Sequence, residues 1–256
     1  MRHLDDLGTP YELGHPPRRI VSLVPSLTES VALTAPDLLV GATDWCTHPA
    51  DLEVARVKGT KWPDLDAIRA LRPDLVLANA EENRAEDIAA LRADGIAVWV
   101  TAPATVPTAL HSLEHMLAAL DIDDPEWLQR ARDLWAEAAP TVDRPVVVPI
   151  WRRPWMVLGR DTFAGDMLAR LGYPNLYAGH ADRYPKIPIG QLRAAGPSLV
   201  VLPDEPYLFT ADDGPEAFPG LPCALVSGRH LTWYGPSLVD AAGILRTQLR
   251  TSLRRS

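Results

Sequence analysis

The sequence contains little cysteine and no long hydrophobic run. Cys46 and Cys223 are its two cysteines, and they lie too far apart in the chain to predict a disulfide framework or a zinc-ligand spacing. No segment approaches the ~18 consecutive apolar residues that predict a membrane-spanning helix. Residues 1–18 lack the apolar core and cleavage pattern of an export signal. The sequence as it stands therefore predicts a cytoplasmic protein, or a periplasmic one if the true start lies upstream.

Basic residues and the common catalytic motifs are also scarce. The chain has 25 Lys and Arg against 33 Asp and Glu, a net charge of −8. This balance argues against a nucleic acid or an anionic membrane surface as partner, because both need a basic footprint. The chain has no G-x-S-x-G elbow, no phosphate-binding G-x-x-x-x-G-K-[ST] loop and no G-x-G-x-x-G. Serine hydrolase, P-loop and Rossmann cofactor functions therefore lack their minimum residues.

Proline and tryptophan, by contrast, are abundant, with 25 prolines and eight tryptophans in 256 residues. Five of the tryptophans fall in loops between the predicted helices and strands: Trp45, Trp62, Trp151, Trp155 and Trp233. A large aromatic side chain is costly to leave in water, so these residues either pack locally or line a binding site.

Apolar runs and amphipathic segments alternate along the chain and predict an α/β fold with mostly parallel sheets flanked by helices. In such sheets, ligands bind beyond the carboxyl ends of the strands. Ser26 to Glu29 fits the S-x-x-E capping box that opens a helix. The predicted strands are 20–24, 38–42, 74–78, 96–101, 146–150, 156–158, 199–202 and 224–226, and the predicted helices are 64–71, 83–93, 106–120, 162–171, 189–195 and 237–249.

An internal repeat predicts two similar lobes. Residues 65–82 and 189–206 both describe a short helix, a Pro turn, a buried strand and a loop carrying a glutamate, and an aromatic-Pro pair precedes each copy. Between the copies, residues 124–139 predict one helix with an apolar stripe that includes Leu134 and Ala138. The predicted organisation is an N-terminal arm (1–18), an N-terminal lobe (19–122), a bridging helix (123–140) and a C-terminal lobe (141–256).

Several polar residues are candidates for ligand contacts. Glu81, Glu82 and Glu205 directly follow the repeat strands, where they could bind amides, hydroxyls or a metal, or be solvated in a loop. Arg152, Arg153 and Arg183 lie beside aromatic residues and could clamp a carboxylate or phosphate. Single histidines in loops, at positions 48, 180 and 230, either form local hydrogen bonds or ligate a metal.

The segment from His111 to His115 matches the H-x-x-E-H pattern of one class of zinc peptidase. A zinc site would need a third ligand, for which Glu126 or Glu137 would serve. The apolar neighbours of the two histidines instead favour the wet edge of an amphipathic helix.

Taken together, these stretches resemble the helical-backbone (class III) substrate-binding proteins of ABC importers, in particular the branch that delivers cobalamin and ferric siderophores. The resemblance covers about residues 19–249. It is carried by RRIVSLVPSLTES at 18–30, VGATDWCTHP at 40–49, GTKWPDLDAIRALRPDLVLA at 59–78, ADGIAVWV at 93–100, the central helix and the second repeat copy. It implies two α/β lobes bridged by one long helix, with the ligand in the cleft between them.

The resemblance also implies roles for individual residues. Trp45 and Trp62 are similar to the first-lobe aromatics that press on the ligand, and residues 81–83 and the loop at Trp233 match cleft-lining stretches. Asp66 corresponds to one of two carboxylates that dock on the importer, whereas the second position carries Gly190. The full set of expected ligand-binding residues is Trp45, Trp62, Glu81, Glu82, Asn83, Trp151, Arg152, Arg183, Tyr184, Glu205, Trp233 and Tyr234.

The sequence therefore predicts a non-catalytic binding protein, expected to be a monomer, for a corrinoid or another bulky metal chelate. No covalent cofactor is implied, no catalytic residue is identified, and the metal is unknown. An ABC importer permease is the expected partner, with docking in doubt because of Gly190. Two alternatives stay open. One is a metal-dependent or chelatase-like enzyme in which His48, His230 and the glutamates hold an ion, and the other is a binding domain for a protein partner.

Overall fold

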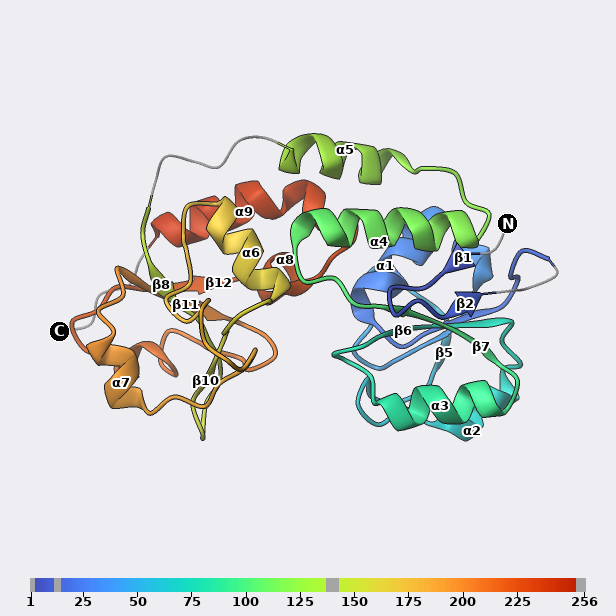
Figure 1. The fold of residues 1–256 in the computed structure, drawn as a ribbon, viewed down its shortest axis with the longest axis horizontal. Helices are drawn as coiled ribbons and strands as arrows, with labels where there is room; N and C mark the ends of the chain where they lie inside the picture. The colour runs from blue at the N-terminus through green and yellow to red at the C-terminus, as the bar shows by residue number, and fades with distance from the viewer. Residues whose placement is uncertain (1–2, 12–14, 137–142, 252–256) are drawn as a thin grey trace. The chain divides into compact units, whose positions relative to one another are not determined.

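The computed structural model describes residues 3–11, 15–136 and 143–251, along which helices and strands alternate (Figure 1). The chain forms two units. The first consists of Met1–Pro103, Pro107–Asp133 and Tyr234–Pro236, and the second of Ala104–Val106, Leu134–Trp233 and Ser237–Ser256. Within the described residues, no helix combines the length and the apolar character needed to cross a membrane.

A five-stranded parallel sheet forms the centre of the first unit, in the order β5-β4-β3-β6-β7. Strands β3 and β6 are buried along their whole length, as expected for central strands that are covered on both faces. The sheet confirms the predicted fold class. Its strands are β3 (Ile20–Ser22), β4 (Leu39–Ala42), β5 (Ala55–Arg56), β6 (Leu75–Asn79) and β7 (Ala97–Thr101).

Helices cover both faces of this sheet. In Figure 1, α1 and α4 lie on one side of it and α2 and α3 on the other. Val21, Val76, Ile68 and Leu91 belong to a buried cluster that joins sheet and helices. The helices are α1 (Pro25–Thr34), α2 (Leu65–Ala70), α3 (Ala85–Ala93) and α4 (Val106–Ala119), with a 3-10 turn at Pro36–Leu38.

The N-terminal segment, predicted as an arm, packs on the first unit. It forms a hairpin of β1 (His3–Leu4) and β2 (Pro10–Tyr11). Asp5 is buried and pairs with Arg92 at 3.0 Å, while the Tyr11 ring meets the buried Trp99 edge-on at 5.8 Å. These contacts attach the hairpin to the edge of the sheet at β7.

The second unit contains a three-stranded parallel sheet, in the order β12-β11-β8, and an antiparallel hairpin of β9 and β10. Phe218, Leu202, Val147 and Leu192 belong to its core. Its strands are β8 (Val146–Val147), β9 (Pro149–Trp151), β10 (Met156–Val157), β11 (Leu199–Pro203) and β12 (Cys223–Val226). Its helices are α6 (Phe163–Arg170), α7 (Ile189–Ala194), α8 (Gly228–Thr232) and α9 (Leu238–Arg250), with a 3-10 turn at Pro215–Ala217.

The two repeat copies have the same local structure. Each consists of a six-residue helix followed by a five-residue buried strand: α2 and β6 in the first unit, α7 and β11 in the second. The connecting turn also has the same length in both copies. The predicted pattern of helix, Pro turn and strand is thus present twice.

Two helix predictions were wrong in detail. Helix α1 begins at Pro25, one residue before the expected cap at Ser26, and no side chain caps it. Proline fixes the backbone angle that the first helical position needs, so it starts the helix before the capping box can. Helix α5 (Glu126–Trp135) buries Leu128, Ala131 and Trp135, but Leu134 is 42% exposed, contrary to the predicted stripe. Ala138 and the rest of 137–142 lie outside the described residues.

Candidate functional site

Four of the expected ligand-binding residues lie at one edge of the first sheet. Because all five strands are parallel, the loops that follow β4, β5 and β6 emerge at their shared carboxyl edge. Trp45 follows β4, Trp62 follows β5, and Glu81 and Glu82 follow β6. We call these four residues and their loops the first-unit edge.

The two tryptophans of the first-unit edge are largely exposed. The exposed fraction is 65% for Trp45 and 70% for Trp62. Trp45 packs over Gly59, where a Cβ would lie 3.4 Å from the indole Nε1. One face of Trp62 is covered by the guanidinium of Arg84, whose Cζ lies 3.9 Å from the ring centroid. Each indole is thus supported on the protein side while most of its surface faces solvent.

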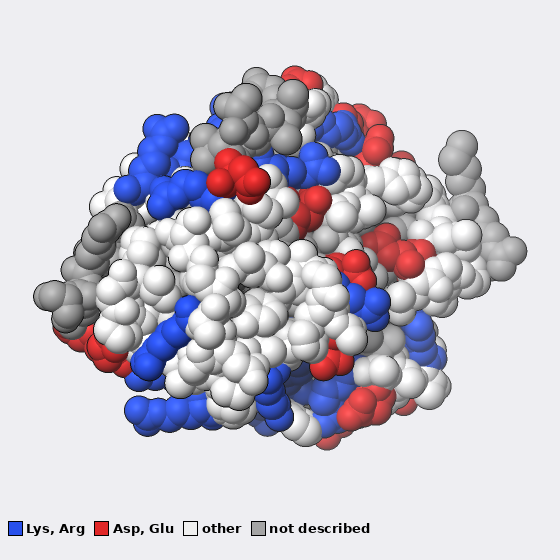
Figure 2. Space-filling model, turned by 60° about the vertical axis from the view of Figure 1, so that its left-hand side comes forward, with Lys and Arg blue, Asp and Glu red and all other residues white. Residues whose placement is uncertain are grey.

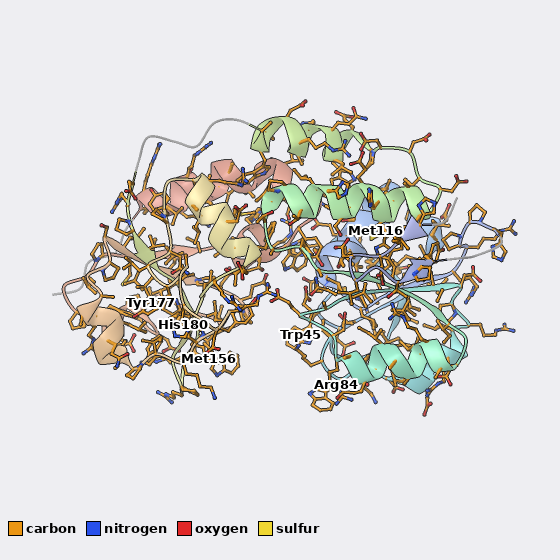
Figure 3. All side chains as sticks on the ribbon, viewed as in Figure 1. Trp45, Arg84, Met116, Met156, Tyr177 and His180 are labelled. Carbon is orange, nitrogen blue, oxygen red and sulfur yellow. The ribbon has the colours of Figure 1, made fainter. Side chains whose placement is uncertain are left out.

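Arg84 is held by carboxylates of its own helix region. Its guanidinium pairs with Asp87 at 2.9 Å and with Glu86 at 3.3 Å. Figure 3 shows Arg84 and Trp45 in neighbouring loops at the same end of the first unit. The cation over Trp62 therefore serves first to hold the ring, since planar guanidinium groups stack well on aromatic faces.

Asn79, which the sequence did not single out, shapes the loop that carries Glu81 and Glu82. Its Oδ1 accepts hydrogen bonds from the backbone N–H groups of Glu81 (2.8 Å) and Glu82 (3.1 Å). Asn83 completes this turn: its Oδ1 accepts from the Asn79 N–H at 2.8 Å and its Nδ2 donates to the Thr60 carbonyl at 3.0 Å. An asparagine at the end of a strand is a turn signal that could have identified this role. Asn83 itself is buried and bonds to backbone.

Tyr234 lies inside the first unit rather than on its surface. Its exposed fraction is 4%, and its hydroxyl bonds to Asn79 Nδ2 at 2.6 Å and to Thr101 Oγ1 at 2.7 Å. Burial, together with the negative charge of Glu82, raises the pKa of the Tyr234 phenol above its ordinary value. Tyr234 thus supports Asn79, and through it the Glu81–Glu82 loop, from beneath.

In the second unit, Trp151 and Arg152 lie in the β9–β10 hairpin. Trp151 is 44% exposed and meets the ring of Tyr207 edge-on at 5.6 Å. Arg152 forms ion pairs with Asp213 and Glu216, and 15% of its side chain is exposed. The structure thus places Trp151 at the surface and the mostly buried Arg152 side chain between two carboxylates.

Glu205 lies at the end of β11, against the start of α8. A Cβ at Gly228 would lie 2.1 Å from the Glu205 Cγ, so only glycine leaves room for this side chain. Burial and the neighbouring Asp204 raise the pKa of the Glu205 carboxyl, and hydrogen bonds from Trp233 and Thr232 act in the opposite direction. Trp233 is 8% exposed. The structure therefore places Glu205 and Trp233 in contact, with the Trp233 ring buried rather than open for stacking, and the role of both residues as ligand contacts stays a prediction.

Arg183 and Tyr184 are half-buried in the loop that precedes Pro185. Arg183 Nη2 donates to the Asp161 carbonyl at 2.6 Å, and the Arg183 carbonyl accepts from the Gly159 N–H at 2.7 Å. A Cβ at Gly159 would lie 2.2 Å from the Asp182 carbonyl oxygen, so the loop approaches this backbone closely. Both residues thus have a structural setting, and their role as ligand contacts stays a prediction.

In the described part of the chain, no group of three or more His, Cys, Asp and Glu side chains is placed to hold an ion. His230 Nδ1 shares a 2.8 Å hydrogen bond with Ser227, and His48 Nδ1 shares one of 3.2 Å with Thr47. His111 and His115 lie on the exposed edge of α4 with ring centroids 3.9 Å apart. Their exposure agrees with the interpretation that the two histidines lie along the polar edge of an amphipathic helix.

The predicted docking residue, Asp66, lies at the start of α2 with 92% of its side chain exposed, and pairs with Arg69 at 2.7 Å. Gly190, at the equivalent position of α7, is exposed, and a Cβ there would meet no atom within 4 Å. Both positions are thus on the surface of their units, and one of them has a carboxylate.

The chain is similar to known binding proteins in both sequence and fold. The chain is 24% identical over 193 residues to the vitamin B12-binding protein of Vibrio cholerae serotype O1. The match covers 72% of this chain and 70% of that protein. The solved structure of periplasmic BtuF from Vibrio cholerae superimposes with a TM-score of 0.70 at 21% identity, covering 92% of this chain and 97% of the other. No family model matches the sequence.

A second solved structure is similar in both sequence and fold. The periplasmic heme-binding protein BhuT, in complex with two hemes, is 26% identical with a TM-score of 0.74, and the match covers 90% of this chain and 97% of BhuT. These similarities confirm the resemblance to the helical-backbone (class III) substrate-binding proteins that the sequence predicted.

Proposed function

Because the chain has the fold of the class III substrate-binding proteins, we propose that it is a non-catalytic binding protein for a bulky, flat metal chelate. The chelate class is a corrinoid, as the vitamin B12-binding relatives suggest, or a ferric siderophore or haem-like ring. Stacking and apolar burial supply most of the affinity, and a few polar groups orient the ring.

The observation that carries this proposal is the exposure of Trp45 and Trp62 on one edge of one sheet. Folding normally removes large aromatic surfaces from water, and a tryptophan that stays two-thirds exposed gains little from the fold. Here both rings are supported from the protein side, by Gly59 and by Arg84. A rigid, solvent-facing indole loses little entropy when a flat ligand stacks on it.

The polar contacts are proposed to come from the glutamates that follow the repeat strands. Glu81 and Glu82 are half-buried on the first-unit edge, and Glu205 is half-buried in the second unit. Their carboxylates suit the amide N–H and hydroxyl groups at the periphery of a corrinoid or the hydroxyls of a siderophore. This assignment rests on their position at strand carboxyl ends.

We infer that the partner of the loaded protein is the permease of an ABC importer, which fits a location outside the cytoplasm like that of the periplasmic neighbours. Asp66 is the proposed docking carboxylate, and its exposure supports that role. Ligand uptake by cells that carry Asp66→Lys should fall severalfold, whereas uptake equal to the wild type would exclude Asp66 from docking. Gly190 leaves the second unit without the matching charge.

Titration of tryptophan fluorescence tests the proposed function. Purified protein is titrated with cyanocobalamin, ferric haem and a ferric siderophore, and we expect saturable quenching by one of these chelates. Trp62→Ala should raise the Kd of that chelate by about 30-fold, the ~2 kcal/mol typical of an aromatic anchor. Leu33→Ala, which truncates another exposed apolar side chain of the first unit, is the control and should bind as the wild type does.

The proposal fails if none of the three chelates quenches the fluorescence of the wild type. Saturable quenching that Trp62→Ala leaves unchanged would keep the binding function but remove the first-unit edge from the site.

A further inference from the structure

Aromatic side chains of the second unit form a continuous series from its core to its surface. Phe218 and Phe209 are buried at 0% and 3% exposure. Trp155 contacts both, edge-on to Phe218 at 5.5 Å and stacked on Phe209 at 6.1 Å. Tyr207 contacts Phe209 at 4.7 Å, and Trp151, 44% exposed, contacts Tyr207 at 5.6 Å. We call Trp151 and Tyr207 the second-unit ring surface. Its rings are fixed by packing.

Arg152 connects this series to a polar network. Its guanidinium lies 5.2 Å from the ring centroid of Trp155 and forms ion pairs with Asp213 and Glu216. The Tyr207 hydroxyl donates to Asp213 Oδ2 at 2.5 Å. Arg152 therefore holds, through Asp213, the same tyrosine that forms half of the second-unit ring surface.

The network leaves Arg152 no surplus positive charge. Two carboxylates surround one guanidinium, and a further donor, the Gly214 N–H, bonds to Glu216 at 2.5 Å. Burial acts to raise the pKa of the Glu216 carboxyl, but the hydrogen bonds from Arg152 and Gly214 prevail and lower it. An anionic ligand group brought to Arg152 would therefore compete with two carboxylates that already bind its guanidinium.

We propose that the second unit contacts the chelate through the ring surface of Trp151 and Tyr207, and that Arg152 is a positioning residue that holds this surface without touching the ligand. This inference rests on the proposed function and narrows its ligand class. The part of the chelate that faces the second-unit ring surface is uncharged, such as a ring face or an amide-bearing edge, rather than a free carboxylate.

The surroundings of the ring surface agree with this assignment. Leu208, next to Tyr207, is 66% exposed and adds further apolar area. Figure 2 shows one face of the molecule, on which Lys, Arg, Asp and Glu side chains are separated by uncharged areas. Recognition by stacking tolerates a planar ring of any chemistry but gives nothing to a carboxylate.

Matched ligand pairs that differ only in charge test the role of Arg152. The pairs are cyanocobalamin with its monocarboxylic acid derivative, and ferric haem dimethyl ester with ferric haem. The variants are Arg152→Lys, Asp213→Asn and Tyr207→Ala, with Leu176→Ala as the control for an exposed apolar residue elsewhere in the second unit. Kd is measured by fluorescence quenching, and folding by circular dichroism.

For the pair that binds, we expect Tyr207→Ala to raise Kd about tenfold for both members. Arg152→Lys and Asp213→Asn should each raise Kd severalfold for both members and leave the ratio of the two Kd values unchanged, since lysine keeps the charge but not the forked geometry. Tyr207→Phe removes only the bond to Asp213 and should have a smaller effect in the same direction.

If Arg152 instead bound a carboxylate of the ligand directly, the Kd values of the variants would follow a different pattern. Arg152→Lys would then weaken the carboxylate member alone, and Asp213→Asn, which frees the guanidinium, would tighten it; this result overturns the proposal. A folded Tyr207→Ala that binds as the wild type does overturns it as well, while leaving the proposed function intact. Failure of the wild type to bind either pair is a failure of the proposed function itself.

Discussion

Glu205 is an acid placed where its charged form is disfavoured. Its pKa is raised first by burial and then by the charge of Asp204, and the hydrogen bonds from Trp233 and Thr232 offset only part of this. A carboxyl in this setting binds its proton more tightly in the folded protein than in the unfolded chain. A ligand N–H or hydroxyl that donates to Glu205 would favour the charged form, which suits the role proposed for this residue.

The raised pKa of Glu205 predicts how stability depends on pH. The folded state binds more protons than the unfolded state in the window between the ordinary pKa of 4.5 and the raised folded value, so the free energy of unfolding falls as pH rises through that window. Glu205→Gln removes this titration. Its free energy of unfolding relative to the wild type should therefore increase as pH rises through the window, as measured by urea denaturation at a series of pH values.

Glu216→Gln provides the opposite case. The pKa of Glu216 is lowered, so its stabilising contribution is present above the ordinary pKa and lost as pH falls through the folded value. This variant should be less stable than the wild type at neutral pH, and the difference should shrink on acidification. Parallel pH profiles for the two variants would contradict the pKa assignments.

Individual residues show which parts of the site the sequence could predict and which it could not. Trp45 and Trp62 stood out because large aromatics in loops are unusual, and both are exposed. The buried settings of Asn83 and Tyr234 could not be predicted, because they depend on a contact between Asn79 and a segment 155 positions away in the chain. Likewise, the charge of Arg152 suggested a clamp, whereas its two carboxylate partners come from a loop about 60 residues further on.

Among the helices and strands, the sequence predicted best those whose buried residues follow a regular apolar pattern. The repeat helices and strands occur as expected, because a buried parallel strand is a continuous apolar run and its flanking helix is short. Helix α8 was not predicted. It has five residues, and its start depends on capping by Ser227, whose side chain accepts from the His230 N–H, and on Asp204, which accepts from the Gly228 N–H at 2.6 Å.

The start of α8 yields a prediction about the element. Gly228→Ala places a Cβ 2.1 Å from the Glu205 Cγ and 2.9 Å from its backbone nitrogen, so the helix start or β11 must shift. We expect a loss of about 1–3 kcal/mol in the free energy of unfolding, as for other overpacked sites. The measurement is chemical denaturation at neutral pH.

Gly243 in α9 is the matched control, because a Cβ there would meet no atom within 4 Å. Gly243→Ala should raise stability by about 0.5–1 kcal/mol, since alanine costs less backbone entropy in a helix. Equal effects of the two substitutions would show that the space at Gly228 is not limiting.

For the whole molecule, the alternation of apolar runs and amphipathic segments predicted the α/β class, and the structure and the comparisons agree with it. The two units are not consecutive halves of the chain. Tyr234–Pro236 belongs to the first unit, although the segments before and after it belong to the second. A division of the chain into consecutive ranges cannot assign a short segment to a different unit from the residues on either side of it. Composition also cannot identify the ligand, because stacking surfaces accept many flat rings.

The proposed function requires that the protein binds one class of flat metal chelate without transforming it. Equilibrium dialysis of the wild type against cyanocobalamin and ferric haem, followed by mass analysis of the recovered ligand, tests this claim most directly. We expect saturable binding of at least one of the two chelates and recovery of that ligand chemically unchanged. Absence of saturable binding for both, or recovery of an altered ligand, would contradict it.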